Sequence, residues 1–119
     1  MRIKEYKMSS KTLIAAAAKP IILSILQTGE NYGYQIIKRV RQASGGTLEW
    51  SSSLLYPVLH RLEKDGLIQS QWKISEKGRM RRNYRITDLG RKELIVEKER
   101  WLSVHDVLKQ FWKTAEAFD

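Results

Sequence analysis

The chain has 119 residues, of which 42% are hydrophobic, and this length suits one domain with a small core. Its 22 Lys and Arg outnumber its 13 Asp and Glu, and the net charge of +9 favours a polyanionic partner, nucleic acid before an anionic membrane. Because the sequence has no cysteine and two histidines, we exclude disulfides, thiol catalysis and cysteine-based zinc sites, and expect no metal cluster. We recognise neither a signal peptide nor a membrane span, so we expect a soluble, cytoplasmic protein.

The first predicted element is a helix from Ser10 to about Gln27. Apolar side chains occur almost all round it, so we expect it to be mostly buried. Pro20 removes one backbone donor and should kink the helix. We expect the basic residues 1–9 to be frayed, and residues 28–31 to form a loop.

A second helix is predicted from Tyr32 to Ser44, where the glycine pair 45–46 stops it. Its apolar side chains recur at helical spacing and should face the core. They are Ile36, Ile37, Val40 and Ala43. Residues 47–50 are compatible with a short extended segment.

A third helix has clear signals at both ends. Pro57 is tolerated best in or next to a first turn, which favours Ser53 as the N-cap and Leu54 as the first helical residue. Asp65 and Gly66 end the helix. The side chains expected to face the core are Leu55, Val58, Leu59 and Leu62. At 100° per residue, the opposite face carries Ser53, Pro57, His60, Arg61 and Lys64.

Two segments at about 67–74 and 82–86 have the composition of strands and predict a hairpin. Residues 77–86, which include its tip, hold five basic residues and no acidic one. Such like charge is mildly unfavourable unless a partner neutralises it, and phosphates are the partner that we expect.

The last predicted element is a helix that begins after Thr87, its N-cap, and runs nearly to the end. Alternating spacings of three and four residues mark a heptad seam, which consists of Leu94, Glu97, Trp101, Val104, Leu108, Phe111, Ala115 and Phe118. A carboxylate at Glu97 is costly if it is buried without a partner. Either two such helices splay and Glu97 meets water, or Glu93, Glu97, Trp101 and His105 line a cleft.

Three helices followed by a hairpin is the element order of a winged helix-turn-helix. We therefore predict a mainly α fold with a small β-hairpin, divided into a winged helix-turn-helix domain over residues 1–86 and a C-terminal dimerisation helix over residues 87–119. The third helix should enter the major groove of DNA while the hairpin reaches the neighbouring backbone.

Three segments in this order resemble the PadR-like transcriptional regulators: NYGYQIIK at 31–38, SLLYPVLHRLEKDGLI at 53–68 and RNYRITDLG at 82–90. The resemblance implies a dimeric winged-helix protein, most often a repressor, whose C-terminal helices form the dimer interface. The single C-terminal helix resembles the small subgroup that includes multidrug-responsive repressors. In that subgroup a tryptophan at the position of Trp101 lines a cleft between protomers. Leu54 departs from the family, which usually has Ser or Thr there.

The predicted partner is double-stranded operator DNA, which the second helix, the third helix and the hairpin should contact. The candidate residues are Tyr34, Lys38, Ser52, Ser53, Tyr56, His60, Arg61, Lys64, Lys77, Arg79, Arg81 and Arg82. For Tyr56, packing against the core and contact with a base both remain open. Strand alternation sends some hairpin cations to opposite faces, so two or three should reach one duplex. The alternatives are a solvated helix face, or a winged-helix module that binds an acidic partner or packs the nucleoid without sequence preference.

The predicted effector site lies between the two protomers of a homodimer. Its candidate residues are Ile14, Ala17, Ile21, Glu93, Glu97, Trp101, His105 and Leu108. An indole beside carboxylates suits a planar, cationic aromatic molecule, and the alternative is that Trp101 only packs in the dimer. We assign Trp50 and Trp72 to core or wing packing. We predict no catalytic residue, because His105 and its neighbour Asp106 point 100° apart on a helix and cannot act as a pair. We also predict no metal site and no cofactor.

Overall fold

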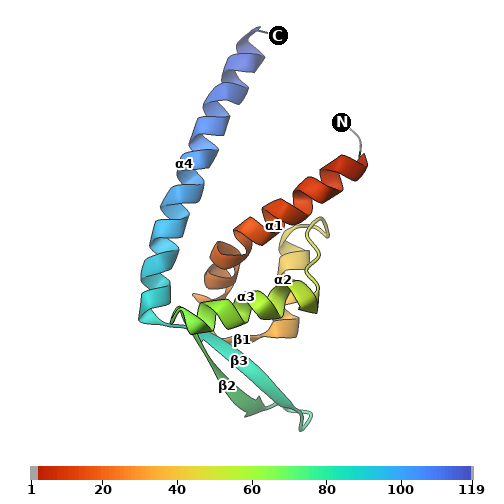
Figure 1. The fold of residues 1–119 in the computed structure, drawn as a ribbon, viewed down its shortest axis with the longest axis vertical. Coiled ribbons are helices and arrows are strands. Elements are labelled where there is room, and N and C mark those ends of the chain that lie inside the picture. The colour runs from red at the N-terminus through yellow and green to blue at the C-terminus, as the bar shows by residue number, and fades with distance from the viewer. Residues whose placement is uncertain (1–2, 119) are drawn as a thin grey trace.

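The computed structural model describes residues 3–118, and side chains over residues 15–117. Three helices and a small sheet form the body, and a long last helix extends away from it (Figure 1). The elements in order are α1 (Ile3–Leu26), β1 (Asn31–Tyr32), α2 (Gly33–Ala43), α3 (Ser52–Lys64), β2 (Ile68–Ile74), β3 (Met80–Ile86) and α4 (Asp88–Phe118). This order confirms the winged helix-turn-helix prediction. No helix among the described residues is long and apolar enough to cross a membrane.

The sheet has three antiparallel strands in the order β1-β3-β2. Strands β2 and β3 pair along their whole length, from Ile68 opposite Ile86 to Ile74 opposite Met80. Strand β1 adds to the free edge of β3 through Asn31 and Tyr32. The prediction of a loop over residues 28–31 was therefore wrong for Asn31, which is the first residue of β1. A two-residue strand is too short to show a period of two, and only pairing with β3 defines it.

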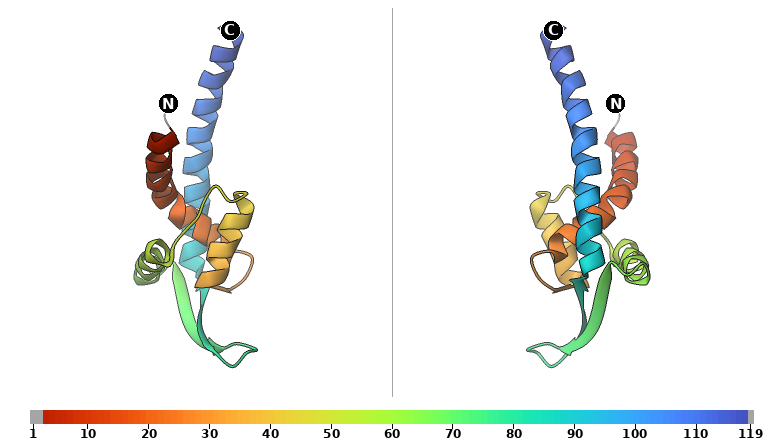
Figure 2. Two further views of the ribbon diagram at one scale, coloured as in Figure 1. Left: turned by 90° about the vertical axis from the view of Figure 1, so that its right-hand side faces the viewer. Right: turned by 90° about the vertical axis from the view of Figure 1, so that its left-hand side faces the viewer.

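Helix α1 begins at Ile3, so the prediction of a frayed segment over residues 1–9 was wrong from Ile3 onward. Pro20 lies inside α1, and the helix changes direction along its length (Figure 2). Its described part buries Ala18, Ile22, Leu23 and Leu26, whereas Ala15 and Ala16 are exposed. From Ala17 to Leu26 every residue is buried or half-buried, so the prediction of a mostly buried helix is confirmed for this stretch and is wrong for Ala15 and Ala16.

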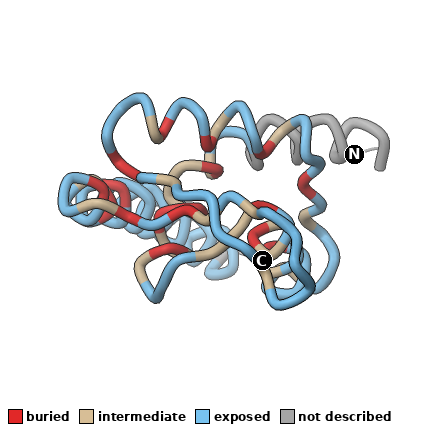
Figure 3. The backbone as a smooth tube through the Cα atoms, turned by 90° about the horizontal axis from the view of Figure 1, so that it is seen from below, coloured by how far each residue is buried: buried red, intermediate tan, exposed pale blue. Residues whose placement is uncertain are grey.

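The core lies where α1, α2, α3 and the inner end of the sheet meet. Ile22 and Leu23 of α1, Ile36 of α2 and Leu55 and Leu59 of α3 are fully buried. Along the helices, buried positions alternate with exposed ones (Figure 3). The core positions predicted for the third helix are confirmed at Leu55, Leu59 and Leu62, and Val58 is half-buried.

Helix α3 begins earlier than predicted. Its N-cap is Ser51, whose hydroxyl accepts a hydrogen bond from the Leu54 amide at 3.2 Å, so the prediction of Ser53 as the N-cap was wrong. The Ser53 hydroxyl instead lies 2.9 Å from the Ser51 hydroxyl. Three consecutive serines are all competent caps, and the extended backbone at Ser51 decides among them. Pro57 consequently lies inside the helix rather than in its first turn.

The start of α4 is fixed against the start of β2. The Thr87 hydroxyl accepts from the Gly90 amide at 3.0 Å, which confirms Thr87 as the N-cap, and donates to the Gly66 carbonyl at 2.7 Å. The Thr87 amide donates to the Leu67 carbonyl at 3.1 Å. Leu94, one turn beyond Gly90, is buried in the core. The division of the chain at residues 86 and 87 stays a prediction.

Candidate nucleic-acid interface

The outer face of α3 is free of covering elements. The predicted DNA-contacting residues Ser52, Ser53, Tyr56, His60, Arg61 and Lys64 are all exposed on it. The Arg61 guanidinium lies 3.6 Å from the Asp65 carboxylate, but both side chains are more than half exposed, and such a pair is weak. This face therefore presents hydroxyl, imidazole and cationic groups, which suit base edges and phosphates.

Tyr56 connects α3 to the start of α2. A Cβ on Gly33 would lie 2.6 Å from the Tyr56 hydroxyl oxygen and 2.9 Å from the ring carbon that bears it. Glycine at position 33 is thus what lets the ring lie across the first turn of α2. The Tyr56 side chain nevertheless remains 46% exposed. Tyr56 therefore packs on α2 with one side, and its exposed part leaves the predicted base contact open.

A groove of about 890 Å³ runs between the start of α2, α3 and the wing, which is the β2–β3 hairpin. Aromatic and cationic side chains share its lining, among them Tyr34, Tyr56, Trp72, Lys77, Arg79 and Arg81. Tyr34 is 63% exposed, and the Lys38 ammonium lies 5.7 Å from the centre of its ring. Cations beside rings and hydroxyls are the kinds of group that suit phosphates and sugars of a DNA strand.

The four predicted wing cations have different surroundings. Lys77 and Arg79 are exposed next to Gly78 in the turn, and neither makes an ion pair with a described residue. The Arg81 guanidinium stacks on Tyr32, 3.9 Å from the ring centre. Arg82 alternates to the other face of β3, and its side chain also lines the groove. The predicted split of these cations between two faces is therefore what strand alternation produces.

Arg82 is bound within the protein. Its guanidinium donates to the Glu63 carboxylate at 2.9 Å and to the Ser70 hydroxyl at 2.7 Å. On the wing, Lys73 also forms an ion pair with Glu30, and this hydrogen bond lowers the pKa of the exposed Glu30 carboxyl. Sequence reasoning found neither Glu30 nor Glu63 as a partner. No helical or strand period links residues so far apart in the chain, so only the folded arrangement identifies them.

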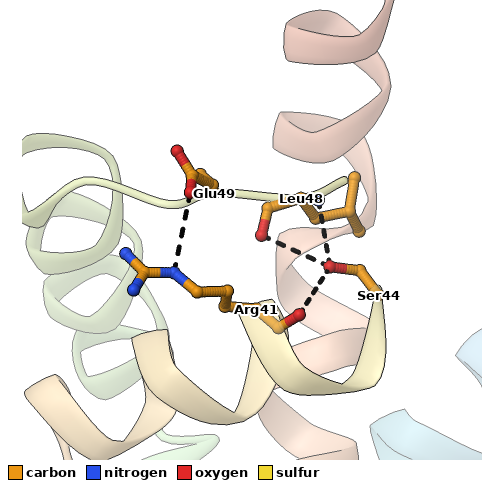
Figure 4. A network of polar contacts seen from close by, with 4 residues as sticks. All are labelled: Arg41, Ser44, Leu48 and Glu49. Atoms are coloured by element: carbon orange, nitrogen blue, oxygen red, sulfur yellow. Dashed lines mark hydrogen bonds and ion pairs between the residues drawn. The ribbon is translucent and has the colours of Figure 1, made fainter. Parts of the chain in front are cut away.

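Trp50 and Trp72 lie in different environments. Trp50 is buried as predicted, and its indole N–H has no hydrogen-bond partner among the described residues. The connection that precedes it is held by an ion pair of 3.7 Å between Arg41 and Glu49 and by the Ser44 hydroxyl (Figure 4). Trp72 is 58% exposed, which excludes core packing and leaves wing packing, with the Arg82 guanidinium 5.9 Å from its ring centre. The wing extends beyond α3, and no element covers that part of the sheet.

A second groove, of about 760 Å³, lies between α1, α2 and the middle of α4. Among the predicted effector residues, Ala17, Ile21, Glu97 and Trp101 line this groove. His105 and Leu108 lie exposed farther along α4 and do not line it. The side chain of Ile14 lies outside the described residues. The structure thus brings half of the predicted set together within one protomer.

Lys19 of α1 is the partner of both carboxylates predicted for the effector site. Its ammonium lies 3.1 Å from Glu93 and 3.2 Å from Glu97, and Glu97 is only 9% exposed. Partial burial lowers the pKa of Lys19, but hydrogen bonds to Glu93 and Glu97 outweigh it and leave that pKa raised. Glu97 is therefore buried with a partner, an arrangement that the periodicity of one helix could not reveal. With all three groups ionised, one positive and two negative charges leave this cluster at −1.

An exposed polar and basic helix face beside a cationic wing defines a winged helix-turn-helix DNA-binding protein, and comparisons with known proteins agree. Residues 22–95 match the family described as Transcriptional regulator PadR-like family. A transcriptional regulator from Clostridium thermocellum is 34% identical, with a TM-score of 0.76 over 84% of this chain and 97% of that one. A PadR family regulator from Clostridium difficile is 31% identical, with a TM-score of 0.71 over 80% and 97%.

A third relative, the transcriptional regulator Rv3488 from Mycobacterium tuberculosis, is 48% identical over 48 residues, which are 40% of this chain and 44% of that protein. The family match covers more than half of the chain. The protein therefore belongs to the PadR-like family of transcriptional regulators, as its three motifs predicted, and it is a DNA-binding regulator rather than an enzyme. Regulators of this family bind operator DNA, typically as dimers.

Proposed function

We propose that the protein is a homodimeric repressor that binds operator DNA through α3 and the wing of each protomer. The observation that carries this proposal is the apolar face of α4, which no residue among the described side chains covers. Its exposed apolar side chains beyond the groove are Val104, Leu108, Phe111 and Trp112, and Phe111 is 67% exposed. A contiguous apolar face of this size on an extended helix is typical of a protein interface. The heptad spacing favours a second copy of the same helix as its cover.

A two-fold dimer accounts for how the interface would read DNA. Two recognition helices α3 would enter successive major grooves, so the half-sites should lie one helical turn apart. The exposed tip cations Lys77 and Arg79 would contact the flanking backbone in both protomers, and they supply salt-dependent affinity more than sequence preference. Repression follows if the bound dimer occupies a promoter.

We also place effector binding at the groove that Trp101 lines. Ala17 and Ile21 are apolar walls beside the indole. Glu97 lines the groove as one member of the Lys19–Glu93–Glu97 cluster, whose net charge is −1, and Arg39 and Lys98 line the groove as well. A planar aromatic molecule suits the indole face, and Glu97 is the group in the groove that would favour a positive charge on that molecule.

The fold supplies a route by which such a ligand would alter DNA binding. Helix α4 carries Trp101 in its middle and rests on Gly66 and Leu67 at its start, directly before β2. A tilt of α4 would therefore move both the dimer partner and the base of the wing. This is coupling between two sites through one rigid element.

Competition between two duplexes tests the proposed function. The protein should bind a fragment of its own promoter at least about 1,000-fold more tightly than a random duplex of equal length at the same salt concentration. It should also lower transcription from that promoter in a purified system. Equal affinity for both duplexes would support a DNA-packing module instead, and activation of transcription would contradict the repressor role.

A further inference from the structure

Three side chains from three elements meet between the recognition helix and the wing. Arg82 of β3 donates through Nε to the Ser70 hydroxyl of β2 at 2.7 Å and through Nη2 to one oxygen of Glu63 at 2.9 Å. The Ser70 hydroxyl hydrogen-bonds to the other oxygen of the same carboxylate. Both oxygens of Glu63, which belongs to α3, are thus held by groups of the wing.

Strand register explains why these groups meet. Residues 68, 70 and 72 of β2 lie opposite residues 86, 84 and 82 of β3, so all six share one face of the sheet. The inner part of this face, with Ile68, Tyr84 and Ile86, is buried in the core. Ser70 and Arg82 come next toward the wing tip. Both are hydrogen-bonded to Glu63 of α3, and nearer the tip Ile74 and Met80 are exposed.

We propose that Arg82 is a positioning residue, which sets the wing against the recognition helix through Glu63 and Ser70 and contributes to operator binding by that route instead of by a phosphate contact. Arg82 differs in this from Lys77 and Arg79, which make no ion pair with a described residue. The proposal rests on α3 and the wing being the DNA-binding surface of the proposed repressor. It assigns a role in DNA recognition to an acidic residue, Glu63, although its negative charge alone would repel the DNA phosphates.

The local environment supports a defined geometry more than a loose surface pair. The Glu63 side chain is 27% exposed and the Arg82 side chain is 44% exposed, so neither is fully solvated. The arrangement has two donors on one carboxylate, and a guanidinium fixed at two of its nitrogens holds its orientation better than a single ion pair. The Trp72 ring lies on the same face, 5.9 Å from the Arg82 guanidinium, and flanks it.

The direction in which Glu63→Ala changes DNA affinity distinguishes a positioning role of Arg82 from a direct phosphate contact. Glu63→Ala removes a negative charge from the DNA-binding side and frees Arg82, so a purely electrostatic interface would bind DNA more tightly. We expect the reverse for the promoter fragment, about tenfold weaker binding, because the wing loses its position. Binding to a random duplex should stay equal or become tighter. Glu76→Ala is the matched control, since Glu76 is an exposed acidic residue in the wing turn without an ion pair to a described residue, and it should not weaken promoter binding.

A double-mutant cycle and a salt titration complete the test. Arg82→Ala, Glu63→Ala and the double variant should weaken promoter binding by similar factors, since each removes the same arrangement. Ser70→Ala, which changes no charge, should give a smaller loss in the same direction. The slope of log affinity against log salt should stay at the wild-type value for Arg82→Ala, whereas loss of a phosphate contact lowers it by about 1.

Three results would overturn the proposal: additive losses in the cycle, a slope lowered by about 1 in Arg82→Ala, or tighter promoter binding by Glu63→Ala. Far-UV circular dichroism measured on every variant shows whether the protein is folded. A wild-type protein that fails to prefer its promoter would contradict the proposed function separately. The salt slope on random duplex would still decide whether Arg82 contacts phosphate.

Discussion

Gly90 lies so close to Leu67 that a Cβ at position 90 would be 2.1 Å from the Leu67 carbonyl oxygen. The same carbonyl accepts a hydrogen bond from the Thr87 amide. The first turn of α4 and the residue that precedes β2 are therefore in contact through backbone atoms alone. This contact links the helix proposed to form the dimer to the base of the wing.

Gly90→Ala should destabilise the fold by about 2–4 kcal/mol, because the added methyl group meets backbone and cannot be relieved by a side-chain rotation. Chemical denaturation followed by circular dichroism measures the change. Lys92→Ala, an exposed position in the same helix, should shift the free energy of unfolding by less than about 0.5 kcal/mol. Equal stability of Gly90→Ala and Lys92→Ala would show that the close approach does not exist in solution.

Gly33→Ala should displace the Tyr56 ring from the start of α2 and weaken operator binding, with little loss for random DNA. The Tyr56 ring carbons leave the new methyl group no room, so the ring must move. In a Tyr56→Ala background the same Gly33→Ala change should cost nothing further, because the obstructing ring is gone. Additive losses in the two backgrounds would mean that Gly33 acts independently of Tyr56.

Lys77→Ala with Arg79→Ala should weaken binding to promoter and random duplex by similar factors. Each phosphate contact removed lowers the salt slope by about 1 per protomer that binds. Salt titrations of both duplexes measure it. Arg85→Ala is the control, since the Arg85 guanidinium already donates to Gln69 on the opposite face of the sheet. A wild-type slope in the double variant would remove the wing tip from the interface.

Leu108→Glu should convert the protein to monomers in analytical ultracentrifugation and strongly reduce promoter affinity, since a monomer contacts one half-site. Leu108 lies on the apolar face of α4, and a charge there cannot be buried against a second helix without large cost. Lys109→Glu, one residue farther and turned by about 100°, should leave the dimer intact. A dimer that persists in Leu108→Glu would place the interface elsewhere.

The sequence predicts those features of the fold and of the candidate site that depend on residues close together in the chain. The element order, the Thr87 cap and the core face of α3 follow from local periodicity and capping, which short segments carry by themselves. Strand β1, the pairing of Lys19 with Glu97 and that of Arg82 with Glu63 join residues far apart in the chain. No local pattern encodes them. The Ser51 cap was missed for another reason, because three serines in a row offer equivalent chemistry.

Trp101→Ala should lose most binding of a planar aromatic cation while keeping the dimer and its DNA affinity. Stacking contributes on the order of 0.5–2 kcal/mol per contact, so wild-type affinity should be micromolar. Isothermal titration calorimetry measures it without relying on the emission of Trp50, Trp72 and Trp112. Lys19→Met should tighten binding of the cation, because Glu93 and Glu97 lose their internal partner. Equal binding by wild type and Trp101→Ala would place any effector site elsewhere.

The most direct test of a dimeric, sequence-specific DNA-binding regulator is hydroxyl-radical footprinting on the promoter fragment. A bound dimer should give two protected patches on one face of the duplex, with centres one helical turn, about 34–36 Å, apart. Both patches should disappear together in Leu108→Glu. Uniform protection along the fragment, or a single patch that persists in Leu108→Glu, would contradict the account.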